Sequence, residues 1–215
     1  MQQVIIAAGG SPSLWPVLDH FSEEAIWIGV DRGSLYLLNH GIQPLVAIGD
    51  FDSLIKEEFE QVARQVKEVI KAQPEKDFTD TELAILEVLK RYPDSEITLI
   101  GASGGRWDHF LANIWLPFHI GDLSITNKLT IADNQNTMRY FLPGDYVIDK
   151  EIDKKYLAFI CLTPIEGFTI HDAKYKLTNV EVAFPTSYAS NEFVSDTVRF
   201  SFTKGVIAVI QSKDK

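Results

Sequence analysis

Two aspartates stand two residues apart in the stretch Gly49-Asp50-Phe51-Asp52-Ser53, directly after the apolar run LVAI. In extended backbone, residues two apart point to the same side, so Asp50 and Asp52 can converge on one cation. Carboxylate oxygens are ligands that Mg²⁺ prefers in proteins. The alternative is that Asp52 or Ser53 caps the following helix, but a cap explains only one of the two carboxylates. The pair therefore favours a metal site.

A second acidic pair, Asp77 and Asp80, lies three residues apart at the predicted start of a helix. In a first helical turn both side chains can face one ligand. Thr79 and Glu82 have the spacing of a capping box, and Asp80 is equally explained as a charge that stabilises the positive end of the helix. Asp77 has no such explanation, so the pair is a second candidate for metal ligation.

A glycine-rich turn follows the apolar run ITLI and leads into another predicted helix, as Gly101-Ala102-Ser103-Gly104-Gly105-Arg106-Trp107-Asp108-His109. Glycines such as Gly104 let backbone N–H groups approach an anion, and Arg106 offers a planar fork to phosphate oxygens. The spacing matches neither the P-loop nor the GxGxxG pattern. Asp108 is explained equally well as a helix cap, and His109 either contacts a ligand or packs on the helix.

A further carboxylate, Asp31, follows the apolar run IWIGV and precedes Arg32 and Gly33. Asp31 can cap the next helix, but it can also join the other strand-end aspartates at one edge of a sheet. Open α/β sheets bind ligands at the carboxyl ends of their strands. Together these loops predict a site for divalent metal and phosphate, with phosphoryl or pyrophosphoryl transfer as the reaction class.

The elements that must position these loops alternate in type through the first half of the chain. Apolar runs at residues 4–8, 26–30, 45–49 and 97–101 alternate with helix-like stretches, which is the pattern of a parallel sheet covered by helices. Residues 67–73 can extend a helix or form a short strand. From about residue 128 only β-like runs follow, broken by PGD, EG, SYASN and KG. We therefore expect an α/β, Rossmann-like, mostly parallel domain at 1–125 and a jelly-roll-like β-sandwich at 126–215.

Composition narrows the function further. A net charge of -10 argues against a general nucleic-acid binder, and an acidic protein that handles polyphosphate needs bridging cations. The lone Cys161 lies in an apolar run and suits a reducing compartment. The sequence shows neither a signal peptide nor an apolar run long enough for a membrane span, so we expect a cytoplasmic protein with no membrane partner.

The motifs resemble those of the thiamine pyrophosphokinase family, in the order GVDRG, HGIQPLVAIGDFDSL, EKDFTDTELAI and GASGGRWDH, with a weaker match at Ser190-Asn191-Glu192-Phe193. The resemblance implies an ATP-dependent diphosphotransferase that converts thiamine and Mg·ATP to thiamine diphosphate and AMP. It also implies a homodimer with the thiamine site where the subunits meet. Arg32 is a departure, because many relatives have glycine at that place.

The resemblance also implies roles for individual residues. Metal and phosphate binding, with catalysis, would fall to Asp50, Asp52, Asp77 and Asp80, together with Arg106. ATP would be bound by Asp31, Arg32, Gly104, Arg106, Asp108 and His109. Thiamine would be bound by Thr79, Ser190 and Asn191.

Three other functions are compatible with parts of the sequence. A haloacid dehalogenase-type phosphatase also carries an aspartate pair at a strand end, although usually on its first strand. A nucleotide or thiamine sensor would use the same loops without turnover. An enzyme that pyrophosphorylates another heterocyclic alcohol, such as a pterin, would share the catalytic half.

Overall fold

The computed structural model describes residues 2–73 and 77–214. They form two compact units, Met1–Asn134 and Gln135–Lys215. The boundary lies later than the expected one between residues 125 and 126. The reason is that the run KLTIA, expected in the β domain, forms a strand paired in parallel with a strand of the first unit. Strand propensity alone does not reveal which partner a strand takes.

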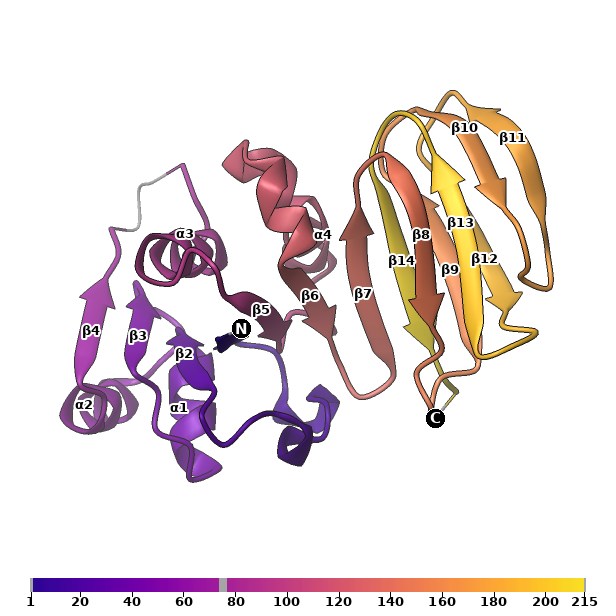
Figure 1. The fold of residues 1–215 in the computed structure, drawn as a ribbon. Helices are drawn as coiled ribbons and strands as arrows, with labels where there is room; N and C mark the ends of the chain where they lie inside the picture. Colours follow the sequence, from indigo (N-terminus) through magenta and orange to yellow (C-terminus); the bar gives the residue numbers. More distant parts are fainter. Residues whose placement is uncertain (1, 74–76, 215) are drawn as a thin grey trace. The chain divides into compact units, whose positions relative to one another are not determined.

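The first unit is built on a parallel sheet, as predicted (Figure 1). Its strand order is β6-β5-β1-β2-β3-β4, and each neighbouring pair is parallel. The strands are β1 (Gln3–Ala7), β2 (Ile26–Val30), β3 (Val46–Gly49), β4 (Glu68–Lys71), β5 (Glu96–Ile100) and β6 (Leu129–Ala132). The open alternative for residues 67–73 is thus resolved as a short strand.

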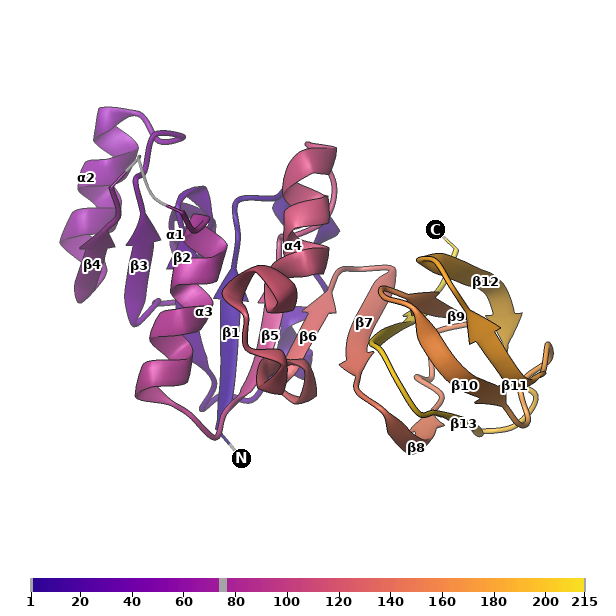
Figure 2. The same ribbon diagram turned by 90° about the horizontal axis from the view of Figure 1, so that it is seen from above.

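Helices cover both faces of this sheet (Figures 1 and 2). They are α1 (Arg32–Asn39), α2 (Lys56–Gln65), α3 (Asp80–Arg91) and α4 (Trp107–Ile120), with 3₁₀ turns at Pro12–Leu14, Leu18–His20 and Leu123–Asn127. Helices α1 and α2 lie on one face, and α3 and α4 on the other. Apolar side chains fill the space between the sheet and its helices. Leu37 and Val62 on one face and Val88 on the other are 0% exposed.

The order of the strands creates a switch point between β1 and β5. The chain runs outward from β1 through β2 and β3 to β4, and then returns to β5 on the other side of β1. Crevices outside the carboxyl ends of strands at such a point are the usual ligand sites of open α/β sheets. The loops after β1, β2, β3 and β5 therefore meet at one edge, as expected from the sequence.

The second unit is an antiparallel β-sandwich, which confirms the predicted class. One sheet has the order β12-β9-β14-β7, and the other β11-β10-β13-β8. Its strands are β7 (Asn136–Phe141), β8 (Gly144–Asp149), β9 (Tyr156–Cys161), β10 (Ile165–Ile170), β11 (Leu177–Val182), β12 (Thr186–Glu192), β13 (Thr197–Phe202) and β14 (Ile207–Ser212). Aromatic rings fill the space between the sheets, with Phe159, Phe168 and Phe200 fully buried.

Two predicted breaks in this unit were wrong. SYASN lies inside β12, which is mostly exposed and polar, so it lacks the apolar alternation that marks a strand in sequence. Glu166-Gly167 lies inside β10, where Gly167 has φ +69 and the pairing register shifts. Bulges of this kind use glycine's freedom without ending the strand. In the ranges that the structure describes, no helix is long and apolar enough to cross a bilayer.

Candidate functional site

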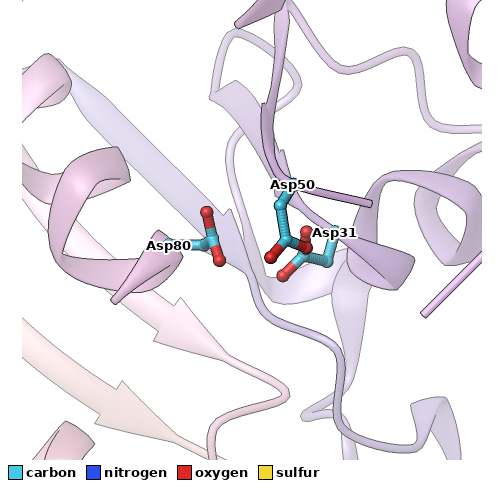
Figure 3. Close-up of side chains that lie close together, drawn as sticks. All are labelled: Asp31, Asp50 and Asp80. Carbon is cyan, nitrogen blue, oxygen red and sulfur yellow. The ribbon is translucent and has the colours of Figure 1, made fainter. Parts of the chain in front are cut away.

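Three carboxylates from three different segments meet at the carboxyl edge of the parallel sheet (Figure 3). One oxygen each of Asp31, Asp50 and Asp80 lies within 4.8 Å of the other two. Asp31 follows β2, Asp50 follows β3, and Asp80 is the first residue of α3. A set of only hard oxygen donors suits Mg²⁺ and does not suit a soft metal.

Asp31 does not cap the helix that follows it. It occupies the N-cap position of α1, but its side chain makes no capping hydrogen bond. Instead its Oδ1 accepts a hydrogen bond from the backbone N–H of Phe51 at 3.1 Å. A Cβ atom on Gly49 would lie 1.9 Å from that oxygen, so only glycine leaves room for the carboxylate. Asp31 therefore ties the loop after β2 to the loop after β3.

The electrostatics of the cluster favour a cation. The pKa of Asp31 is raised to about 7, first by burial and then by the negative charges of Asp80, Asp50 and Asp52. A divalent ion would offset both effects, because it supplies positive charge where the carboxylates repel one another. The donor set and its charge thus fit a magnesium ion.

Asp52 and Asp77 lie outside the three-carboxylate cluster. Both are exposed, and the backbone N–H of Asp52 donates to Oδ1 of Asp50 at 3.0 Å. Neither Asp52 nor Ser53 caps α2, since that helix begins at Lys56 with Ile55 in the N-cap position. The fold therefore brings Asp31, rather than Asp52, close to Asp50 and Asp80.

The Arg32 guanidinium binds other groups of the protein instead of extending toward the carboxyl edge of the sheet. It donates two hydrogen bonds to the Glu58 carboxylate of α2, at 2.9 and 3.2 Å, and one to the carbonyl of Ser53. Glu58 also accepts from the N–H of Ile55 at 3.1 Å. Arg32 and Glu58 together fix the far end of the loop that carries Asp50.

The glycine-rich turn after β5 has left-handed backbone at Gly101, Gly104 and Gly105, with φ between 66 and 78. At Gly104 a Cβ atom would meet the Leu14 side chain at 2.4 Å. The buried amide of Asn113 on α4 donates to the carbonyl of Ala102 at 3.1 Å and anchors the turn to the helix. The turn is therefore built for close backbone approach, as a phosphate-binding loop requires.

Arg106 and Asp108 form an exposed pair at the start of α4. The guanidinium meets the carboxylate at 3.1 and 2.5 Å, and the two side chains are 72% and 62% exposed. This hydrogen bond is the main reason that the pKa of Asp108 falls to about 2. Arg106 is the N-cap residue and the helix has no side-chain cap, so the capping explanation of Asp108 was wrong. His109 is exposed beside the pair.

The capping box predicted for α3 is confirmed. Thr79 Oγ1 accepts from the N–H of Glu82 at 3.3 Å, and Glu82 Oε2 accepts from the N–H of Thr79 at 2.7 Å. The sequence did not reveal that the other oxygen of Glu82 accepts from Nδ1 of His119 on α4 at 2.7 Å. Such a pair, 37 residues apart in the chain, leaves no pattern in a single sequence.

In the second unit, the two residues predicted to contact thiamine differ in exposure. Ser190 is exposed, has φ +60, and stands at a shift in the register between β12 and β9. Asn191 is 2% exposed, and its amide bonds both the N–H and the carbonyl of Tyr175 at 2.9 and 2.8 Å. Tyr175 itself is 58% exposed. Sequence reasoning missed Tyr175, whose only signal is an aromatic residue in the polar loop DAKYK.

Comparison with known families gives two matches. Residues 18–129 match the family described as thiamin pyrophosphokinase, catalytic domain. Residues 145–207 match the one described as thiamin pyrophosphokinase, vitamin B1 binding domain. The first range contains the three carboxylates and the glycine-rich turn, and the second contains Tyr175, Ser190 and Asn191.

Individual relatives agree over the whole length. The chain is 38% identical to a thiamine pyrophosphokinase of Bacillus subtilis, with both chains fully covered. It resembles the crystal structure of a thiamin pyrophosphokinase family protein from Enterococcus faecalis with a TM-score of 0.93 and 48% identity, again over all of both chains. For the thiamin pyrophosphokinase of Candida albicans the TM-score is 0.75 at 15% identity, over 98% of this chain and 90% of that one, which is a likeness of fold.

Proposed function

The chain belongs to the thiamine pyrophosphokinase family, and on that premise we propose that it transfers the pyrophosphoryl group of Mg·ATP to the hydroxyl of thiamine. The products are thiamine diphosphate and AMP. The observation that carries this proposal is the meeting of Asp31, Asp50 and Asp80 at the same edge of the sheet as the glycine-rich turn that ends in Arg106.

Asp31, Asp50 and Asp80 would hold Mg²⁺. The exposed Asp52 and Asp77, which lie two residues after Asp50 and three before Asp80, stay predicted ligands. When bound, the ion supplies positive charge that neutralises the polyphosphate and orients it for in-line attack. The protein contributes the geometry. Asp31 fixes the loop after β3 through the Phe51 N–H, and the Arg32–Glu58 pair fixes the end of that loop.

The turn after β5 supplies the phosphate contacts in this proposal. Backbone N–H groups around Gly104 approach the phosphates, and Arg106 exchanges its partner Asp108 for phosphate oxygens as charge develops on the transferred group. Asp108 and His109 stay proposed ATP contacts, since both are exposed beside Arg106. One aspartate of the cluster accepts the proton of the attacking hydroxyl.

The proposed thiamine contacts come from the second unit. Ser190 offers its hydroxyl, Asn191 holds Tyr175 in place, and the exposed ring of Tyr175 is suited to stacking on a cationic heterocycle. Thr79 would contact thiamine from the first unit. We further propose the homodimer implied by the family resemblance, with thiamine bound where subunits meet. A cytoplasmic location fits the lone cysteine and the supply of ATP.

The direct test measures product stoichiometry. Purified protein is incubated with Mg·ATP and thiamine, and AMP, ADP, free phosphate and thiamine diphosphate are quantified. We expect AMP and thiamine diphosphate in equal amounts, and Asp50→Asn to lower turnover by about two orders of magnitude. Asp94→Asn is the matched control, because Asp94 is exposed just before β5, at the opposite edge of the sheet.

Other products would identify another function. Free phosphate without AMP would indicate a phosphatase, and thiamine binding without any product would indicate a sensor. AMP formed with a pterin alcohol but not with thiamine would contradict the assigned acceptor while keeping the reaction class.

A further inference from the structure

The three proposed metal ligands are not held equally. Asp31 and Asp50 follow the adjacent, paired strands β2 and β3, and the Phe51 N–H links their loops directly. Asp80 approaches from the opposite direction at the start of α3 (Figure 3). Its distance from the other two carboxylates therefore depends on how the first turn of α3 is fixed.

Glu82 is the side chain that fixes that turn. It lies two residues after Asp80, and its side chain is only 3% exposed. One oxygen accepts from the N–H of Thr79 and the other from Nδ1 of His119, each at 2.7 Å. A buried carboxylate that loses a partner is costly, so the direction of Glu82 depends on His119 as well as on its own helix.

A second contact joins the same segments. The ring of Phe78 packs against the His119 imidazole, with the centroids 5.5 Å apart and the planes at 59°. His119 thus touches residues on both sides of Thr79. Because His119 lies in the last turn of α4, that helix joins the glycine-rich turn at its start to the Asp80 segment near its end.

We propose that His119 is a positioning residue, which acts through Glu82 to hold Asp80 where it shares a cation with Asp31 and Asp50. The inference rests on the proposed function, because it assumes that the three carboxylates bind a divalent metal. His119 itself touches neither the metal nor the substrates. Its role is to donate from Nδ1 to the oxygen of Glu82 that does not accept from the Thr79 N–H, so that both oxygens of this buried carboxylate are held.

The test uses electron paramagnetic resonance to measure Mn²⁺ binding to the full chain in the absence of nucleotide. His119→Ala should weaken Mn²⁺ binding by roughly 10-fold. This is the effect typical of removing a residue that orients a metal-binding group without touching the metal. His119→Asn should restore most of the affinity, because its amide nitrogen reaches nearly the position of Nδ1. The Mg²⁺ concentration that gives half-maximal turnover should shift in parallel.

A matched control separates this role from general support of α3. Arg91 lies in the last turn of the same helix, where it bonds Glu87 and, on β4, Glu68. Arg91→Gln removes the bonds that hold the other end of α3, and it should leave Mn²⁺ affinity unchanged. His119 is about half exposed, so its variants should fold, and thermal melting verifies that they do.

Three results would overturn the inference. His119→Ala could bind Mn²⁺ as the unaltered chain does, His119→Asn could fail to restore binding, or Arg91→Gln could weaken binding equally. If the unaltered chain bound no Mn²⁺, the metal site of the proposed function would fall, and this inference with it. That outcome is distinct, because it appears before any substitution is made.

Discussion

At the scale of single residues, the site is built from side chains that do more than one task. Asp31 is a proposed metal ligand and also the acceptor that holds the N–H of Phe51. Phe51 has φ +60, unusual for a residue with a side chain, and its buried ring packs on Phe59 with 5.1 Å between centroids. Strained backbone of this kind is kept at functional sites when surrounding contacts hold it in place.

The raised pKa of Asp31 predicts that metal binding depends on pH. In the metal-free protein this carboxyl is protonated below about pH 7, so the incoming cation must displace a proton. Mn²⁺ affinity should therefore rise by about tenfold per pH unit up to about pH 7 and then level off. Binding isotherms between about pH 5.5 and pH 8 measure this dependence.

Stability should show the opposite trend when metal is absent. A pKa raised in the folded state stabilises the protein below the unfolded value of 3.8, and that contribution is lost as the pH rises through about 7. The melting temperature of the unaltered chain should thus fall relative to that of Asp31→Asn over this range. A constant difference between the two proteins would contradict the assignment.

At the scale of elements, sequence reasoning succeeded where the signal is local. The capping box of α3 was read from Thr79 and Glu82, and the strands that end at Asp31 and Asp50 from continuous apolar runs. It failed where the signal is distant. The parallel partner of β6, the bond from His119 to Glu82 and the use of Arg32 by Glu58 all depend on residues brought together only by folding.

Asn191, a predicted thiamine contact, also makes a contact between two elements of the second unit. Its buried amide holds the backbone of Tyr175, in the loop between β10 and β11, against β12. Asn191→Ala should cost about 1 to 3 kcal/mol of stability and raise the KM for thiamine while leaving the KM for ATP unchanged. Steady-state kinetics with each substrate varied in turn would separate the two effects.

Gln211 provides the control for that prediction. Gln211 is 9% exposed, and its side chain accepts from the N–H of Glu151 and donates to the carbonyl of Asp149, so these bonds do not involve Tyr175. Gln211→Ala should lower stability similarly without changing either KM. If the KM for thiamine rises in both variants, the rise is caused by the lower stability of the β-sandwich and not by loss of the contact between Asn191 and Tyr175.

At the scale of the whole molecule, each unit carries its own core. The aromatic cluster around Phe159 and Phe200 belongs to the second unit, and the clusters around Trp15 and Phe51 to the first. All four tryptophans, Trp15, Trp27, Trp107 and Trp115, lie in the first unit. Tryptophan fluorescence therefore reports on the unit that carries the proposed metal site.

This division predicts two separable transitions in a variant of the second core. Phe200→Ala removes a fully buried ring that contacts Phe141, Tyr146 and Phe159, and should cost about 3 to 5 kcal/mol. Both units contribute to far-ultraviolet circular dichroism, which should gain a separate transition at lower temperature from the strands of the second unit, while the transition seen by tryptophan fluorescence should stay. A joint shift of both signals would show that the units unfold as one.

The irregular stretch of β12 has a consequence for behaviour at high concentration. β12 is an edge strand, paired on one side with β9, and such strands are places where chains add to one another and form fibres. The shift of register between Tyr188 and Asn191, with left-handed backbone at Ser190, interrupts the row of groups that a second strand would need. The same distortion that exposes the Ser190 hydroxyl thus also protects this edge against aggregation.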